Sequence, residues 1–486
     1  MNESAPDPRR WRALILLCAA QFMVILDASI VNVALPSIKG GLHLSQSNLQ
    51  WVVNAYTLTF GGMLLLGGRA ADLLGRRRVL IAGLGLFALA SLAGGLAQSQ
   101  TEIILARVVQ GLGAATLSPA ALAIVSTTFT EGQERNKALG VWGALSGAGG
   151  AAGVLLGGIL TTELSWRWVF FVNVPVGALV IALIPRLIRE SRPPARPPGY
   201  DVGGALSITI GLLVLVYALV ETAHHPWGSA WTVCLLVEAA ALLTVFLLQE
   251  WRSRAPLMPL RIFAIRSVLC ANVVGLLIGA ALYSMFYFIS LYLQQVLGYS
   301  ALKAGLSYVP LSVGIILAAG GASAISNRFS PRWALLGGAA LLGGGLVLFS
   351  RVPPHGSFTG NVLLPSLLVA CGLGLSFVAL TILAVAGVRG EEAGVASGLF
   401  NTSQQVGAAI GLALLSTIAN SRTSSLVRAA HGAPAAMPHA LTSGFDTAFA
   451  VAAGFAVLGG LLAVVLLCRT NTSPAGVAAQ AAGAAS

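Results

Sequence analysis

Apolar stretches of membrane-spanning length follow one another along nearly the whole chain, and they leave little room for a water-soluble fold. An α-helix crosses a bilayer with about 20 mostly apolar residues, each rising about 1.5 Å. Charged residues make up only 9% of the 486 residues and apolar residues 56%, whereas soluble domains carry about 25% charged residues. The sequence therefore predicts an all-α integral membrane protein with many spans.

Fourteen transmembrane helices are predicted, with the N- and C-termini in the cytoplasm. The spans lie near residues 14–36, 49–68, 79–97, 103–126, 138–162, 168–187, 203–222, 230–249, 267–296, 304–326, 334–350, 362–387, 395–420 and 444–468. This arrangement places most of the 28 lysines and arginines in cytoplasmic segments, the bias expected for short loops. The basic residues left in outer segments are Lys39, Arg167, Lys303, Arg351, Arg422 and Arg428.

The spans divide into two six-helix bundles and an inserted pair. Residues 1–190 form the predicted N-terminal bundle, 191–260 the inserted pair with its cytoplasmic linkers, and 261–470 the C-terminal bundle. Residues 471–486 are rich in alanine and glycine and are predicted to be disordered. Basic turns recur at the same place in both bundles, near residues 72–77 and 327–332. Such repeats are common in transporters, whose substrate site lies at the midplane between them.

Several function classes are excluded by what the chain lacks. The net charge of +12 resides mainly in the cytoplasmic loops, where topology and anionic lipid account for it, so nucleic-acid binding is not indicated. We find no metal-ligand spacing and no nucleophile–base set, so an enzyme is not expected. A Gly-x4-Gly-Lys-Ser/Thr phosphate loop is also missing. We therefore expect no cofactor and no ATP drive, with a proton gradient as the energy source.

Asp27 is the one acid in the first predicted span. A charge at the centre of a membrane helix costs about 3 kcal/mol, and acids there are functional by default. Burial disfavours the ionised form of a carboxyl, which suits a group that gains and loses a proton near neutral pH. A structural carboxyl held by hydrogen bonds is the alternative.

Arg107 lies in the fourth predicted span, roughly 8 Å from the outer surface, whereas Asp27 lies roughly 14 Å from it. We predict that it approaches Asp27 and favours release of the proton, because a nearby cation favours an ionised acid. Asp27 and Arg107 are thus the candidate proton-coupling residues. The rival interpretation is an arginine that extends to the outer surface.

Two glycine-containing segments are candidates for conformational roles. The loop after the second span contains Gly68, Asp72, Gly75, Arg76 and Arg77, a polar cluster that can latch one conformation. Its alternative is simple positive charge on the cytoplasmic side. The fifth span carries glycines that allow close packing of helices or act as a hinge. These are Gly149, Gly153, Gly157 and Gly158.

These motifs together resemble the major facilitator superfamily, and within it the fourteen-span drug:proton antiporters, over about residues 10–470. Residues 26–36 are similar to the family's first-helix motif, and the 68–77 loop to its loop signature. Arg107, Gln110 and Gly111 match the fourth-helix motif linked to proton transfer. Residues 166–177, 201–204 and 396–407 are typical of the subfamily. One departure is Val154, where the family's antiporter motif usually has proline, so a proline kink is not expected.

A cavity between the bundles is predicted to have aromatic walls and a few polar groups, which suit bulky amphipathic compounds. The candidate lining residues are Asn32, Asn54, Tyr56, Gln110, Asn272, Tyr283, Phe286, Tyr287, Asn401, Gln404 and Gln405. Each is individually also consistent with ordinary packing. Because acids are scarce in the spans, neutral or singly charged compounds are favoured over dications.

The resemblance implies a monomeric, proton-coupled exporter of hydrophobic or cationic drug-like compounds in the plasma membrane, surrounded by lipid and working by alternating access. Two alternatives stay open. One is a dedicated exporter of a single metabolite, lipid or peptide, which a panel of unrelated compounds would distinguish. The other is a receptor or scaffold that kept the fold without transport.

Overall fold

The computed structural model describes residues 9–129, 133–188, 190, 202–222, 225–253, 256, 260–328, 330–388, 393–431 and 437–467. The regular elements in these ranges are helices, with no strand among them, so the all-helical prediction is confirmed. The tail 471–486, predicted to be disordered, and the linker 191–201 lie outside the described residues.

The N-terminal part of the chain forms long helices with two short ones. Its elements are α1 (Arg10–Gly41), α2 (Gln46–Leu49), α3 (Trp51–Leu74), α4 (Arg76–Leu96), α5 (Gln100–Thr128), α6 (Gln133–Glu163), α7 (Trp168–Phe171) and α8 (Asn173–Leu187). Two further helices, α9 (Val202–Glu221) and α10 (Ala230–Arg252), pack against each other. They correspond to the predicted inserted pair.

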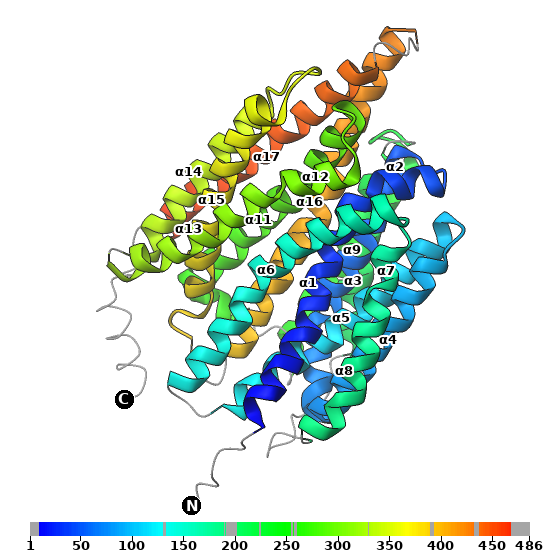
Figure 1. The fold of residues 1–486 in the computed structure, drawn as a ribbon. Coiled ribbons are helices and arrows are strands. Elements are labelled where there is room, and N and C mark those ends of the chain that lie inside the picture. Colours follow the sequence, from blue (N-terminus) through cyan, green and yellow to red (C-terminus); the bar gives the residue numbers. More distant parts are fainter. Residues whose placement is uncertain are drawn as a thin grey trace, which may run out of the picture.

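The C-terminal part repeats the pattern of long helices. It contains η1 (Leu260–Ala264), α11 (Arg266–Leu291), η2 (Tyr292–Val296), α12 (Ala301–Ser307), α13 (Val309–Arg328), α14 (Pro331–Phe349), η3 (Phe358–Val362), α15 (Leu363–Val385), α16 (Ala393–Ala429) and α17 (Met437–Leu467). The start of α1 and the end of α17 lie at the same end of the molecule (Figure 1).

Ten helical stretches among the described residues are long and apolar enough to cross a membrane. The predicted spans 49–68, 138–162, 203–222 and 395–420 correspond to α3, α6, α9 and α16, which are helical without a described apolar stretch of that length. The chain is thus a multi-pass membrane protein. The count of fourteen spans, the cytoplasmic termini and the division into three parts stay predictions.

Serine side chains fix where several helices begin. Ser99, Ser229 and Ser300 precede α5, α10 and α12, and each side-chain oxygen accepts a hydrogen bond from the backbone N–H three residues later. Such caps satisfy N–H groups that have no partner inside the helix. They also extend α5 beyond the predicted span 103–126 at its N-terminal end.

The helices pack in two groups, which contact each other where α6 meets α12 and where α3 meets α16. In the N-terminal part, α5 packs against α3 and α4, while α1 packs against α6 and α8. In the C-terminal part, α11 packs against α16 and α17, and α15 against α13 and α14. One buried apolar cluster joins the C-terminal portion of α1, from Ile30 to Ile38, with side chains of α11, α12 and α14. A second cluster belongs to the N-terminal helices alone.

Candidate functional site

Asp27 on α1 and Arg107 on α5 form a buried ion pair. The Nη1 atom of Arg107 lies 2.6 Å from Oδ2 of Asp27, and the two side chains are 1% and 0% exposed. The sequence predicted that these two residues of different helices approach each other, and the packing of α1 against α5 brings them into direct contact. Arg107 is therefore not an arginine that extends to the membrane surface.

Two amides complete the surroundings of the Asp27 carboxylate. Nε2 of Gln110 donates to Oδ1 at 2.7 Å, and Nδ2 of Asn173 donates to the same oxygen at 3.1 Å. The hydroxyl of Ser91 on α4 accepts from Gln110 at 2.8 Å and from Asn173 at 3.4 Å. The Asp27 carboxylate thus faces one cation and two amide donors, and such charge-assisted contacts are among the strong hydrogen bonds of proteins.

Arg107 is itself held from three directions. Its Nε donates to the carbonyl of Val52 at 2.8 Å, and its Nη1 donates to Oε1 of Gln110 at 2.7 Å. The ring of Tyr56 lies under the guanidinium, with 4.2 Å between Cζ and the ring centroid, a distance suited to cation–π attraction. Gln110 and Tyr56, two of the predicted cavity residues, are thus engaged by the ion pair; their place in a cavity wall stays a prediction.

Glycines on α6 pack against the same stretch of α1 that carries Asp27. A Cβ atom added at Gly149 would lie 2.7 Å from Ile25, and one at Gly157 would lie 2.8 Å from the carbonyl of Ile30. Between them, a Cβ at Gly153 would collide with Ser29. The small residues therefore let α6 approach the helix of the ion pair closely. α6 runs unbroken from Gln133 to Glu163 through Val154, the position without the usual proline.

One further glycine of α6 faces the C-terminal helices. A Cβ at Gly158 would lie 2.9 Å from the carbonyl of Ala301, and one at Gly305 would lie 2.7 Å from the carbonyl of Val154. The backbone N–H of Leu302 donates to the hydroxyl of Thr162 at 3.1 Å. The C-terminal ends of α6 and α1 thus meet α12 and α11, the latter through Ser290, whose hydroxyl donates to the carbonyl of Asn32.

The loop between α3 and α4 is held by an acid from the segment after α8. Gly75 has φ of +104°, a conformation that glycine adopts without strain. Oε1 of Glu190 accepts from the backbone N–H of Arg77 at 3.1 Å, and Oε2 lies 3.8 Å from Nε of Arg78. A Cβ added at Gly68 would lie 3.5 Å from Pro119, an ordinary contact distance. The side chain of Asp72 lies outside the described part of the chain.

The remaining predicted cavity residues are spread over α1, α3, α11 and α16. Asn32 and Asn54 are buried, and Oδ1 of Asn32 and both polar atoms of Asn54 have no hydrogen-bond partner among the described residues. Gln404 is buried with a similarly unpartnered Nε2, while Gln405 accepts from the hydroxyl of Tyr283 at 3.0 Å. Phe286 stacks on Tyr308, and Tyr287 is buried. Nδ2 of Asn272 donates to the carbonyl of Val268. The side chain of Asn401 is exposed.

Four polar residues that the structure draws attention to were not singled out from the sequence. Ser91 and Asn173 belong to the Asp27 network, and Glu190 holds the loop. Asp446 lies inside α17, a candidate span, and one of its carboxylate oxygens is buried without a partner in the described part of the chain. Asn173 stands within the 166–177 motif, and Asp446 is an acid in a predicted span, so the sequence contained a signal for both.

Comparisons with known proteins identify the family to which the sequence is similar. The sequence profile described as the Major Facilitator Superfamily matches residues 17–412. The chain is 41% identical to the puromycin resistance protein of Streptomyces alboniger over 95% of this chain and 92% of that protein. It is 40% identical to the cephamycin export protein of Amycolatopsis lactamdurans, over 96% and 94%.

A solved structure shows the same fold at lower sequence identity. It is a bacterial homologue of the human lysosomal transporter Spinster, with a TM-score of 0.70 and 17% identity over 95% of this chain and 98% of that one.

Proposed function

Because this chain belongs to the Major Facilitator Superfamily, and is therefore a membrane transporter and not an enzyme, we propose that it exports antibiotic-like compounds across the plasma membrane by exchange for protons. The names of its relatives, a puromycin resistance protein and a cephamycin export protein, support the substrate class. The observation that carries the proton coupling is the buried contact of Asp27 with Arg107.

Asp27 is the proton carrier in this proposal. Protonation removes its negative charge, so the attraction to Arg107 is lost and the guanidinium is left buried without an anion. An unpaired buried charge is costly, by about 3–5 kcal/mol, and the helices that carry the two residues are expected to rearrange. Inward proton movement supplies about 2.3 kcal/mol per charge for each 100 mV of membrane potential.

Alternating access requires a contact between the two groups of helices that forms in one state and opens in the other. The contacts of α6 and α1 with α12 and α11 lie at the predicted outer end, and they suit closure on that side. The Gly68–Arg77 loop lies at the predicted cytoplasmic end. Its hydrogen bond from the backbone N–H of Arg77 to Glu190 suits the role of a latch. Because α6 packs on the α1 turn that carries Asp27, its movement is coupled to the ion pair.

Buried polar atoms without partners support a substrate path between these helices. Asn54 lies two turns from Gly61 on the same face of α3, and a Cβ at Gly61 would lie 2.6 Å from Gln405 on α16. Oδ1 of Asn32, both polar atoms of the Asn54 amide and Nε2 of Gln404 have no partner in the described part of the chain, and they suit binding of a substrate or water. A few such groups among apolar and aromatic side chains suit hydrophobic or singly charged compounds.

The deciding experiment follows proton movement in everted membrane vesicles with an imposed acid-inside gradient. Puromycin, a cephamycin and a panel of unrelated cationic and neutral drugs are added to wild type, Asp27→Asn and Glu238→Gln. Glu238 is the matched control, because it is an acid in a candidate span but is exposed and outside the network. We expect drug-induced proton release in wild type and Glu238→Gln, and none in Asp27→Asn.

The outcomes separate the competing functions. Proton release with several unrelated drugs supports a multidrug exporter, and release with one compound supports a dedicated exporter. Drug transport without proton movement contradicts antiport. Thermal unfolding of each purified variant distinguishes a lost coupling residue from a misfolded protein, and partial activity of Asp27→Glu would show that the carboxyl is what matters.

A further inference from the structure

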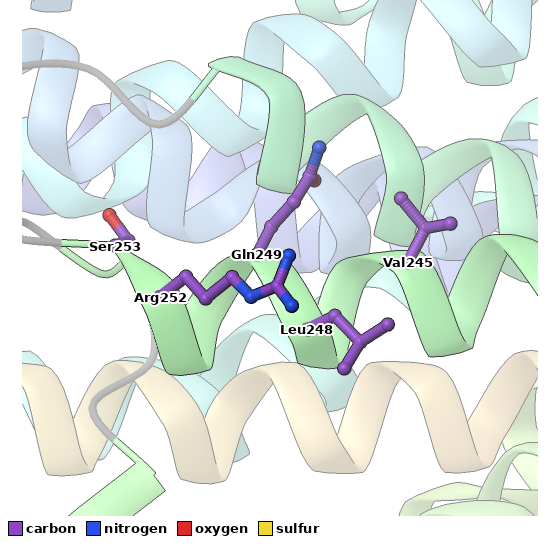
Figure 2. A pocket seen from close by; sticks show the side chains of 5 residues that line it. All are labelled: Val245, Leu248, Gln249, Arg252 and Ser253. Carbon is purple, nitrogen blue, oxygen red and sulfur yellow. The ribbon is translucent and has the colours of Figure 1, made fainter.

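A cavity of about 450 Å³ lies beside the C-terminal end of α10, away from the Asp27 network. It is lined by Val245, Leu248, Gln249, Arg252 and Ser253 (Figure 2). Along α10, the apolar lining residues Val245 and Leu248 come before the polar residues Gln249, Arg252 and Ser253. In Figure 2 the guanidinium of Arg252 extends back along α10 toward Leu248. The cavity thus has an open lining with an apolar part and a cationic part.

Two exposed tryptophans indicate the depth of this cavity in the membrane. Trp231 is 52% exposed near the start of α10, and Trp251 is 74% exposed near its end. Their separation along the helix corresponds to roughly 30 Å, the thickness of the hydrocarbon core. Exposed tryptophans gather at membrane–water interfaces. Arg252 therefore lies at the level of the lipid head groups, on the side predicted to be cytoplasmic.

The cavity presents the positive charge of Arg252 at this interface. Arg252 is exposed and makes no ion pair among the described residues, and it is the only charged residue in the described part of the cavity lining. The neighbouring acid, Glu250, is buried at 3% exposure and is not part of the lining. The amide of Gln249 accepts from the hydroxyl of Ser207 on α9, so α9 supports this wall.

We propose that this cavity binds an anionic phospholipid of the cytoplasmic leaflet, with the phosphate of the head group at Arg252 and an acyl chain along Val245 and Leu248. Basic pockets at the cytoplasmic ends of membrane helices bind anionic head groups. The apolar wall distinguishes a lipid from a soluble phosphate, because only a lipid carries a chain for Val245 and Leu248 to contact. The site would anchor the α9–α10 pair in the membrane independently of transport.

The test uses the full-length protein in nanodiscs that contain brominated lipids, which quench nearby tryptophan fluorescence. The signal of Trp251 is obtained by subtracting that of a Trp251→Phe variant. Brominated phosphatidylglycerol is compared with brominated phosphatidylcholine in wild type, Arg252→Gln, Arg252→Lys and Arg186→Gln. Arg186 is the matched control, an exposed arginine in the last turn of α8, at the same predicted membrane side.

In wild type we expect phosphatidylglycerol to bind beside Trp251 about fivefold more tightly than phosphatidylcholine, the preference that one arginine near the surface provides. Arg252→Gln should remove the preference, whereas Arg252→Lys and Arg186→Gln should keep most of it. Equal quenching by both lipids in wild type would overturn the proposal. So would a preference that survives Arg252→Gln, an equal loss in Arg186→Gln, or displacement of the lipid by millimolar inorganic phosphate.

Discussion

Replacement of Arg107 should cost the protein much of its stability. Arg107→Gln leaves the Asp27 carboxylate buried without its cation, and such a loss costs about 3–5 kcal/mol. Thermal unfolding of the purified protein measures it, with Arg186→Gln as a control at an exposed arginine. The double variant Arg107→Gln with Asp27→Asn should recover part of the loss, because no unpaired charge remains. Unchanged unfolding of the single variant would contradict the ion pair.

Asn173 donates a hydrogen bond to the same carboxylate without carrying charge. Asn173→Ala removes one of the two amide donors to Oδ1 of Asp27, and hydrogen bonds to charged groups are worth about 1.5–3 kcal/mol. Because the loss leaves the Asp27 network incomplete, drug-induced proton release in vesicles should fall below that of wild type. The rate of this release and the thermal unfolding of the purified variant measure the effect. Ser207→Ala, outside the network, should leave proton release unchanged.

The approach of α6 to α1 can be tested with two glycines only one turn apart. Gly153→Ala places a methyl group against Ser29, whereas a Cβ at Gly150 meets nothing within 4 Å. Gly153→Ala should therefore destabilise the protein and slow transport. Gly150→Ala should stabilise it by about 0.5–1 kcal/mol, since alanine favours a helix over glycine. If both variants unfold alike, α6 does not pack on α1 as described.

For the molecule as a whole, the contact between α6 and α12 is expected to open during transport. Thr162→Cys with Leu302→Cys, joined by a short thiol cross-linker in a background without native cysteines, should stop transport until the link is cleaved. The cross-link would fix the neighbourhood of the Leu302–Thr162 hydrogen bond. As a control, Arg422→Cys with Ser443→Cys joins α16 to α17 within one group of helices and should leave transport intact. Full transport by the cross-linked first pair would exclude opening at this contact.

The sequence predicted those site residues that stand out individually by their charge. Asp27 and Arg107 are charges inside apolar stretches, where their cost makes them conspicuous. Ser91 and Asn173 are uncharged, and polar residues of this kind occur in many helices for ordinary reasons. Their role depends on which faces α4 and α8 turn toward α1, and that is set by packing.

The fold was predicted to the level of its helices and less well at their ends. Hydropathy located the helices because the bilayer sets their length. It could not reveal that Glu190, in a linker, holds the loop between α3 and α4, since this contact joins residues far apart in the chain. The close packing of Gly158 on Ala301 is likewise a product of the tertiary arrangement.

The enclosure of Asp27 by helices from the N-terminal part alone has a consequence for how such a protein can diversify. The network draws on α1, α3, α4, α5 and α8, whereas Tyr283, Gln404 and Gln405 belong to α11 and α16. Natural selection can therefore alter Tyr283, Gln404 and Gln405 without replacing a residue of the Asp27 network. Under the proposed function, the substrate range could change in this way while the energy supply is inherited unchanged, and only Tyr56 and Gln110 would be shared by both.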